Sequence, residues 1–143
     1  MFPRGNFFDQ NSVENKEQKM RRRQGKIIVP KGMLVEPHEL VTATALSWTG
    51  HDVEFISERN IHTPDIMFCN KEWEMKSPKG NSSRTIENNM REALRQSKNI
   101  IIDLHRIKLP EQKCIATVKS RAAKLGHIRD VIVVTKTDKV IIL

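Results

Sequence analysis

Two carboxylates and an ammonium group are spaced so that a single β-hairpin would bring them together. Eight residues separate Asp65 from Glu74, and Lys76 lies two positions further on. Side chains two apart in a strand share a face, so Glu74 and Lys76 point the same way. A turn near Asn70 would place Asp65 on the neighbouring strand, opposite Glu74. The spacing therefore predicts one site made of Asp65, Glu74 and Lys76.

Such a site suits the hydrolysis of a phosphodiester bond. Carboxylate oxygens are hard ligands that suit Mg²⁺ or Mn²⁺, with Zn²⁺ as a further candidate. A bound metal ion polarises phosphate oxygens and lowers the pKa of a bound water. The ammonium of Lys76 would orient that water or offset charge in the transition state. A Glu-x-Lys strand also occurs as an ordinary exposed ion pair, so the surrounding elements must decide between the two interpretations.

The charge balance favours a polyanionic partner. The 143 residues include 25 Lys and Arg against 17 Asp and Glu, a formal net charge of +8, and a basic surface attracts nucleic acid. No stretch approaches the ~20 apolar residues of a membrane span, and the first 15 residues lack the apolar run of a secretory signal. We therefore expect a nucleic-acid partner, no membrane partner and a cytoplasmic site of action. Cys69 and Cys114 are too few to indicate a metal site or a disulfide by spacing.

The chain divides into a tail and a folded domain. Residues 1–25 are polar and end in a basic cluster, which we interpret as a tail or linker with a helix expected over residues 14–23. Two roles stay open for it: a solvated leader or an extra phosphate-binding arm. Residues 26–143 are long enough for one domain with one core. We expect this second segment to be the nuclease domain.

The patterns in residues 26–143 predict an α/β fold, with a mixed central sheet flanked by helices. The expected helices cover about residues 36–50, 85–98 and 111–125, and the expected strands cover 52–57, 65–69, 71–76, 99–104, 131–135 and 140–143. Leu40, Ala43 and Leu46 form one apolar stripe of the first helix, and Val41, Ala45 and Trp48 extend it. Both Trp48 and Trp73 are expected in the core.

The spacing also resembles a known signature. Pro64-Asp65 with Glu74-Met75-Lys76 resembles that of the PD-(D/E)xK nuclease superfamily, which includes restriction enzymes and Holliday-junction resolvases. The superfamily core runs helix, three strands, helix, strand, in the order expected here. The resemblance implies a further metal ligand on the first helix, matched by Glu39 with Glu36 as a substitute. It also implies a glutamine near the site, matched by Gln96, although the tyrosine that usually follows it is replaced here by Ile100.

A narrower resemblance covers about residues 36–143. The runs from Trp73 to Gly80 and from Gln96 to Leu104 are similar to the C-terminal toxin domain of CdiA-type tRNA nucleases. That similarity implies tRNA, favoured over DNA, as the substrate. It also implies a cognate immunity protein as a partner.

Basic and polar side chains around the expected site are candidates for binding nucleic acid. They lie in the loop after the catalytic strand, on the second helix and at the end of the isoleucine-rich strand. The candidates are Lys79, Arg84, Arg91, Arg95, Gln96, His105 and Arg106.

Three other functions stay open on the sequence alone. The first is a metal-independent RNase of the barnase, colicin D or RelE-like type, with acid–base groups drawn from Lys76, His105, Thr135 and Lys136. The second is a DNA endonuclease or resolvase-like enzyme. The third is a non-catalytic nucleic-acid-binding module, which needs the basic surface but not the carboxylates.

Overall fold

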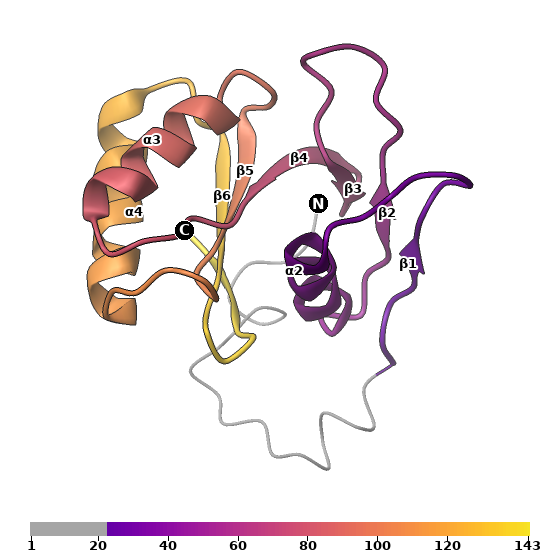
Figure 1. Cartoon of the computed structure of the whole chain (residues 1–143), viewed down its shortest axis with the longest axis horizontal. Helices are drawn as coiled ribbons and strands as arrows, with labels where there is room; N and C mark the ends of the chain where they lie inside the picture. The colour runs from indigo at the N-terminus through magenta and orange to yellow at the C-terminus, as the bar shows by residue number, and fades with distance from the viewer. Residues whose placement is uncertain (1–22) are drawn as a thin grey trace.

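The computed structural model describes residues 23–143 as a curled sheet with helices on both sides (Figure 1). The helix expected in the tail lies outside the described residues. The helices are α2 (Pro37–Ser47), α3 (Ser83–Ala93) and α4 (Glu111–Leu125). The strands are β1 (Ile27–Ile28), β2 (Val53–Phe55), β3 (Ile66–Phe68), β4 (Lys71–Lys76), β5 (Asn99–Asp103), β6 (Asp130–Val134) and β7 (Val140–Ile142).

The seven strands form one mixed sheet in the order of the chain. The antiparallel pairs are β2–β3, β3–β4 and β6–β7, whereas β1–β2, β4–β5 and β5–β6 are parallel. Parallel neighbours need a crossover, and α3 and α4 supply it between β4 and β5 and between β5 and β6. The predicted α/β class and element order are confirmed, with β1 as an addition that the sequence did not indicate.

Two apolar cores lie on opposite faces of the sheet. One packs α2 against β1–β4 and one face of the central strands, and it includes Trp73, Met75 and Ile101. The other packs α3 and α4 against the opposite face and includes Ile86, Met90 and Ile102. Figure 1 shows α3 and α4 together on one side of the central strands, with α2 on the other.

The β3–β4 hairpin fixes which side chains face each other. Its two-residue turn has positive φ at both Cys69 (52°) and Asn70 (63°), the backbone of a type I′ turn that matches strand twist. The register pairs Ile66 with Trp73, so continuing the pairing by one residue sets Asp65 opposite Glu74. The expected turn at Asn70 is therefore confirmed, and Cys69 adopts the left-handed region as well.

The second helix is shorter than predicted. Helix α3 ends at Ala93 and not at Lys98, and turns fill the interval. Side-chain hydrogen bonds to the Glu72 carbonyl explain the early end, because Ser97 Oγ donates to it over 3.0 Å and Asn99 Nδ2 over 3.1 Å. These bonds hold residues 97–99 beside β4, where β5 begins.

The prediction for the apolar side of α2 is only partly correct. Ala43, Ala45 and Leu46 are buried as expected, but Leu40 and Val41 are 45% and 43% exposed. Apolar residues occur on two sides of this helix, and only one side can contact the sheet. Trp48 is also outside the fully buried core, whereas Trp73 is completely buried as predicted.

Candidate functional site

Asp65 and Glu74 form a pair of carboxyl groups on adjacent strands. Asp65 precedes β3, where its backbone N–H donates to the Trp73 carbonyl over 3.0 Å. Its Oδ2 atom accepts a hydrogen bond of 2.7 Å from the backbone N–H of Met75, which holds the side chain against β4. The two carboxyl groups are close enough for each to change the pKa of the other. The structure therefore brings together the two carboxylates that the sequence predicted.

The pair is buried enough to change its protonation. Burial, and then the charge of Asp65, raise the pKa of Glu74 to about 8, and burial raises the pKa of Asp65 as well. Glu74 Oε1 is buried and has no hydrogen-bond partner. Because burial and the charge of Asp65 both disfavour the ionised form of Glu74, the pair is expected to hold one proton at neutral pH.

Lys76 completes the predicted group of three. Its Nζ atom lies 3.8 Å from Oε2 of Glu74 and 3.6 Å from Oε2 of Glu92. The Lys76 side chain is 23% exposed and that of Glu74 is 8% exposed, so the ammonium lies at the mouth of the site and the carboxylate lies below it. Glu92 belongs to α3 and was not among the predicted residues, because nothing in its spacing ties it to β4.

Glu39 lies near the pair without completing a ligand cluster. Its charge raises the pKa of both Asp65 and Glu74. Its Oε1 atom accepts a hydrogen bond of 3.0 Å from the backbone N–H of Glu36, at the start of α2. Within residues 23–143, no group of three or more His, Cys, Asp or Glu side chains is placed to hold a metal ion. The preformed site is thus a carboxylate pair beside a lysine.

Replacing the buried acid with its amide should stabilise the metal-free protein at high pH. The raised pKa of Glu74 means that its contribution to stability is present below about pH 4.5 and is lost as pH rises through about 8. Glu74→Gln carries no such charge, so its melting temperature should exceed that of the wild type by ~5 °C at alkaline pH. The difference should shrink in acid. Melting temperatures are measured in a chelator at acid and at alkaline pH. Glu54→Gln, at an exposed position of β2, is the control. Melting temperatures that respond equally to pH in the two variants would contradict the prediction.

The predicted nucleic-acid-binding residues fall into two groups. Lys79, Arg84 and Arg95 are exposed and form no salt bridge with the residues described. In contrast, Arg91 pairs with Glu87 one helical turn away at 3.0 Å. Arg106 donates to the Ser77 carbonyl over 2.6 Å, which holds the loop after β4. The structure leaves the first three side chains available to a polyanion, and Gln96 lines a polar cleft near the start of β5.

His105 is held between two acids. Its Nδ1 lies 2.7 Å from Oδ1 of Asp103 and its Nε2 lies 2.8 Å from Oδ1 of Asp138. Burial alone would lower its pKa, but the hydrogen bonds and charges of the two aspartates outweigh burial and raise it. Thr42 of α2 donates to the other oxygen of Asp103. With both ring nitrogens occupied, His105 joins α2, β5 and the β6–β7 turn instead of reaching toward a substrate.

The remaining acid–base candidates are also occupied. Thr135 is buried, and its hydroxyl bonds that of Thr137 at 3.2 Å. Lys136 Nζ donates to the Ile107 carbonyl. These contacts give the side chains structural roles at the β6–β7 turn.

Loss of the His105 contacts should destabilise the protein most in acid. Because the folded state raises the pKa of His105, its contribution to stability is complete below the unfolded pKa of about 6.5 and is lost as pH rises through the folded value. His105→Gln should therefore lower the melting temperature near pH 5 and change it little near pH 9. The exposed His127 gives the control variant, His127→Gln. A loss of stability that is the same at both pH values would show that the imidazolium makes no special contribution.

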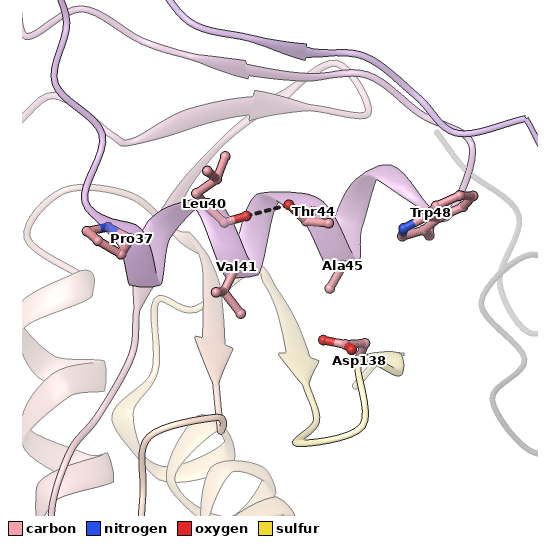
Figure 2. Close-up of a pocket in the computed structure, with 7 residues that line it drawn as sticks. All are labelled: Pro37, Leu40, Val41, Thr44, Ala45, Trp48 and Asp138. Atoms are coloured by element: carbon pink, nitrogen blue, oxygen red, sulfur yellow. Dashed lines mark hydrogen bonds between the residues drawn. The ribbon is translucent and has the colours of Figure 1, made fainter.

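A hollow on α2 differs in character from the carboxylate site. Figure 2 shows it between the helix and the β6–β7 turn, lined by Pro37, Leu40, Val41, Thr44, Ala45, Trp48 and Asp138. The lining is mainly apolar, and its one charged side chain is an acid. None of the described residues that line it is a cation that would attract a phosphate, so the carboxylate site is the candidate for chemistry on nucleic acid.

The chain matches a family model over residues 62–140, which describes the contact-dependent growth inhibition CdiA C-terminal domain. The chain belongs to this family. The matched span of this CdiA C-terminal domain includes Asp65, Glu74 and Lys76, and it extends through α3 to the start of β7. Glu39 lies outside it.

The fold has a counterpart among solved structures. It resembles a chain of the CdiA-CT/CdiI toxin and immunity complex from Burkholderia pseudomallei, with a TM-score of 0.61 and 19% sequence identity. The likeness covers 83% of this CdiA C-terminal domain and 98% of that chain. No curated protein matches the sequence. Among residues 23–143, no helix combines the length and apolar character needed to cross a bilayer.

Proposed function

We propose that this CdiA C-terminal domain is a nuclease toxin that hydrolyses phosphodiester bonds with the help of a divalent metal ion, in the manner of the PD-(D/E)xK superfamily. The observation that carries the proposal is the pair formed by the buried Glu74 and the partly buried Asp65, with the Lys76 ammonium 3.8 Å from Glu74. Buried, mutually repelling carboxylates are costly to maintain, and perturbed titration is typical of functional sites.

The pair fits a magnesium-type ion. Mg²⁺ is commonly bound through one or two carboxylates together with substrate phosphates, so a cluster of three acids is unnecessary. The orphaned Oε1 of Glu74 supplies a lone pair that no protein group uses. Asp65 and Glu74 would hold the ion, and Glu39 is the proposed third ligand if it exchanges its helix-cap bond for the metal. When bound, the ion would polarise the phosphate and acidify a water molecule.

The residues of the chain have separate tasks in this proposal. The backbone N–H of Met75 keeps the Asp65 carboxylate turned toward Glu74. Glu92 and Glu74 hold the Lys76 ammonium between them, where it can offset charge on the phosphate during cleavage. The cations of Lys79, Arg84 and Arg95 bind the phosphates on either side of the phosphodiester bond that is cleaved.

We further propose tRNA as the preferred substrate, the cytoplasm as the site of action and a cognate immunity protein as the partner. The basic composition supports a nucleic-acid substrate. The structural counterpart from Burkholderia pseudomallei belongs to a toxin and immunity complex, which supports the proposal of an immunity protein as the partner.

One incubation tests the function. Purified protein is mixed with total tRNA and, separately, with plasmid DNA, with Mg²⁺ or with EDTA. Cleavage of tRNA that requires Mg²⁺ is the expected result. Cleavage that persists in EDTA would refute the metal mechanism, and cleavage of plasmid in preference to tRNA would refute the substrate.

A further inference from the structure

A polar cleft adjoins the carboxylate pair where β4 and β5 begin. Its volume is about 430 Å³, within the range of small-molecule sites. Four segments line it: Pro64, Asn70–Glu72, Gln96–Asn99 and Arg129. Pro64 directly precedes Asp65, and Glu72 lies two residues before Glu74 on the same face of β4. A ligand in the cleft would therefore lie next to the phosphodiester group at the carboxylate pair.

The cleft carries uncompensated positive charge. Two salt bridges at its rim are each neutral overall. The Lys71 ammonium lies 2.7 Å from the Asp130 carboxylate, and the Arg59 guanidinium lies 2.8 Å from the Glu72 carboxylate. Lys98 and Arg129 are exposed, and their side chains form no salt bridge or hydrogen bond within residues 23–143. Two free cations at the rim suit an anionic group such as a phosphate.

The wall of the cleft contains acceptors that lack donors. Asn99 donates its amide N–H to the Glu72 carbonyl over 3.1 Å, which fixes the orientation of that amide. Its Oδ1 atom is then left without a partner, and so is Oε1 of Gln96. Buried acceptors without donors are unfavourable. A ligand that offers N–H groups would satisfy them after a small rotation of the side chains.

We propose that this cleft binds one nucleotide of the substrate, beside the phosphodiester bond that is cleaved. Lys98 and Arg129 would bind its phosphate, and the amides of Gln96 and Asn99 would face N–H groups on the edge of its base. A nucleotide combines both features in one ligand, whereas a free phosphate would leave the amide oxygens unsatisfied. The inference rests on the proposed function, since it assigns part of the substrate to a second location in the same site.

The first experiment measures the salt dependence of binding. In the Glu74→Gln background, which should bind without cutting, the affinity for a short labelled RNA is measured over a range of salt concentrations. Adding Lys98→Ala and Arg129→Ala should lower the slope of log affinity against log salt by about 0.7, the contribution of one neutralised phosphate on a single strand. The control pair Lys113→Ala and Lys119→Ala removes the same charge from exposed positions of α4 and should leave the slope unchanged.

The second experiment tests base recognition in the active protein. Oligonucleotides that differ only in the base beside the cleavage position are compared by kcat/KM. Gln96→Ala should reduce the preference among them about 10-fold, because a lost hydrogen bond to a base discriminates at that level. Lys113→Ala should preserve the preference.

The outcomes separate this inference from the proposed function. Unchanged salt slope in the Lys98 and Arg129 variant, or unchanged base preference in Gln96→Ala, with normal cleavage by the wild type, overturns the nucleotide cleft alone. A wild type that cuts no nucleic acid but whose RNA binding still depends on Lys98 and Arg129 overturns the proposed function and supports the cleft.

Discussion

Asp65→Asn and Glu74→Gln should each lower the rate of cleavage below about 10⁻³ of the wild-type rate, while the fold survives. Losing one well-placed electrostatic group costs an enzyme about 10²–10³-fold in rate, and a lost metal ligand removes the ion's contribution as well. The amides are nearly isosteric with the acids, so the strands should keep their register. The measurement is a single-turnover cleavage assay on tRNA, with circular dichroism to confirm folding.

Two details of the structure sharpen this expectation. In Asp65→Asn, the carbonyl oxygen of the new side chain can still accept the hydrogen bond from the Met75 N–H, so a loss of rate cannot be attributed to a displaced strand. Glu54→Gln, on an exposed position of β2, controls for the removal of one negative charge. Cleavage at the wild-type rate by either amide variant would remove the proposed metal site. A Glu74→Gln variant that melts higher and cuts nothing would show that the acid is kept for catalysis at the expense of stability.

Lys76→Met should lower the cleavage rate about 10²–10³-fold and leave metal binding intact. An ammonium has no lone pair to offer a metal ion, and its removal ends its repulsion of the incoming cation. Methionine keeps much of the aliphatic length of lysine, so the packing beside Glu92 changes little. Calorimetric titration with Mg²⁺ compares this variant with Glu74→Gln.

The pH of that titration matters. The Lys76 charge lowers the pKa of Glu74, so the variant holds the proton of the pair more tightly, and the proton competes with the ion. At a pH well above 8, high enough to ionise Glu74 in Lys76→Met as well as in the wild type, metal affinity should be equal or higher in Lys76→Met and weaker in Glu74→Gln. Equal loss of metal binding in both variants would mean that Lys76 supports the geometry of the pair and does not act on the phosphate.

The local signals in the sequence predicted that Asp65 and Glu74, at the centre of the candidate site, lie together. The separation of Asp65 from Glu74 and a turn residue at Asn70 were sufficient, because a hairpin converts sequence spacing directly into cross-strand pairing. Helix α4 likewise has the predicted bounds, and Gly126, with φ of 64°, ends it. In these cases the deciding interactions involve residues close in sequence.

The features that the sequence did not predict depend on distant neighbours. Periodicity placed Leu40 in the core, but the position of the sheet beside α2 decides which apolar side is covered. The sequence left His105 available for acid–base work, whereas Asp138, 33 residues later, occupies its second nitrogen. Glu92 could not be assigned to Lys76, because the packing of α3 on β4 creates that contact.

The β3–β4 hairpin has a consequence for how the domain folds. Asp65, Glu74 and Lys76 lie within twelve consecutive residues, and a hairpin closes in about 1–10 μs. The parallel pairing of β4 with β5 needs the α3 crossover and belongs to the slower, non-local contacts. The relative positions of the three groups can thus be set early in folding. The burial that raises the pKa of Glu74 needs β5 and α3 beside β4, so a partly folded chain with only the hairpin formed would hold Asp65 and Glu74 as ordinary ionised acids.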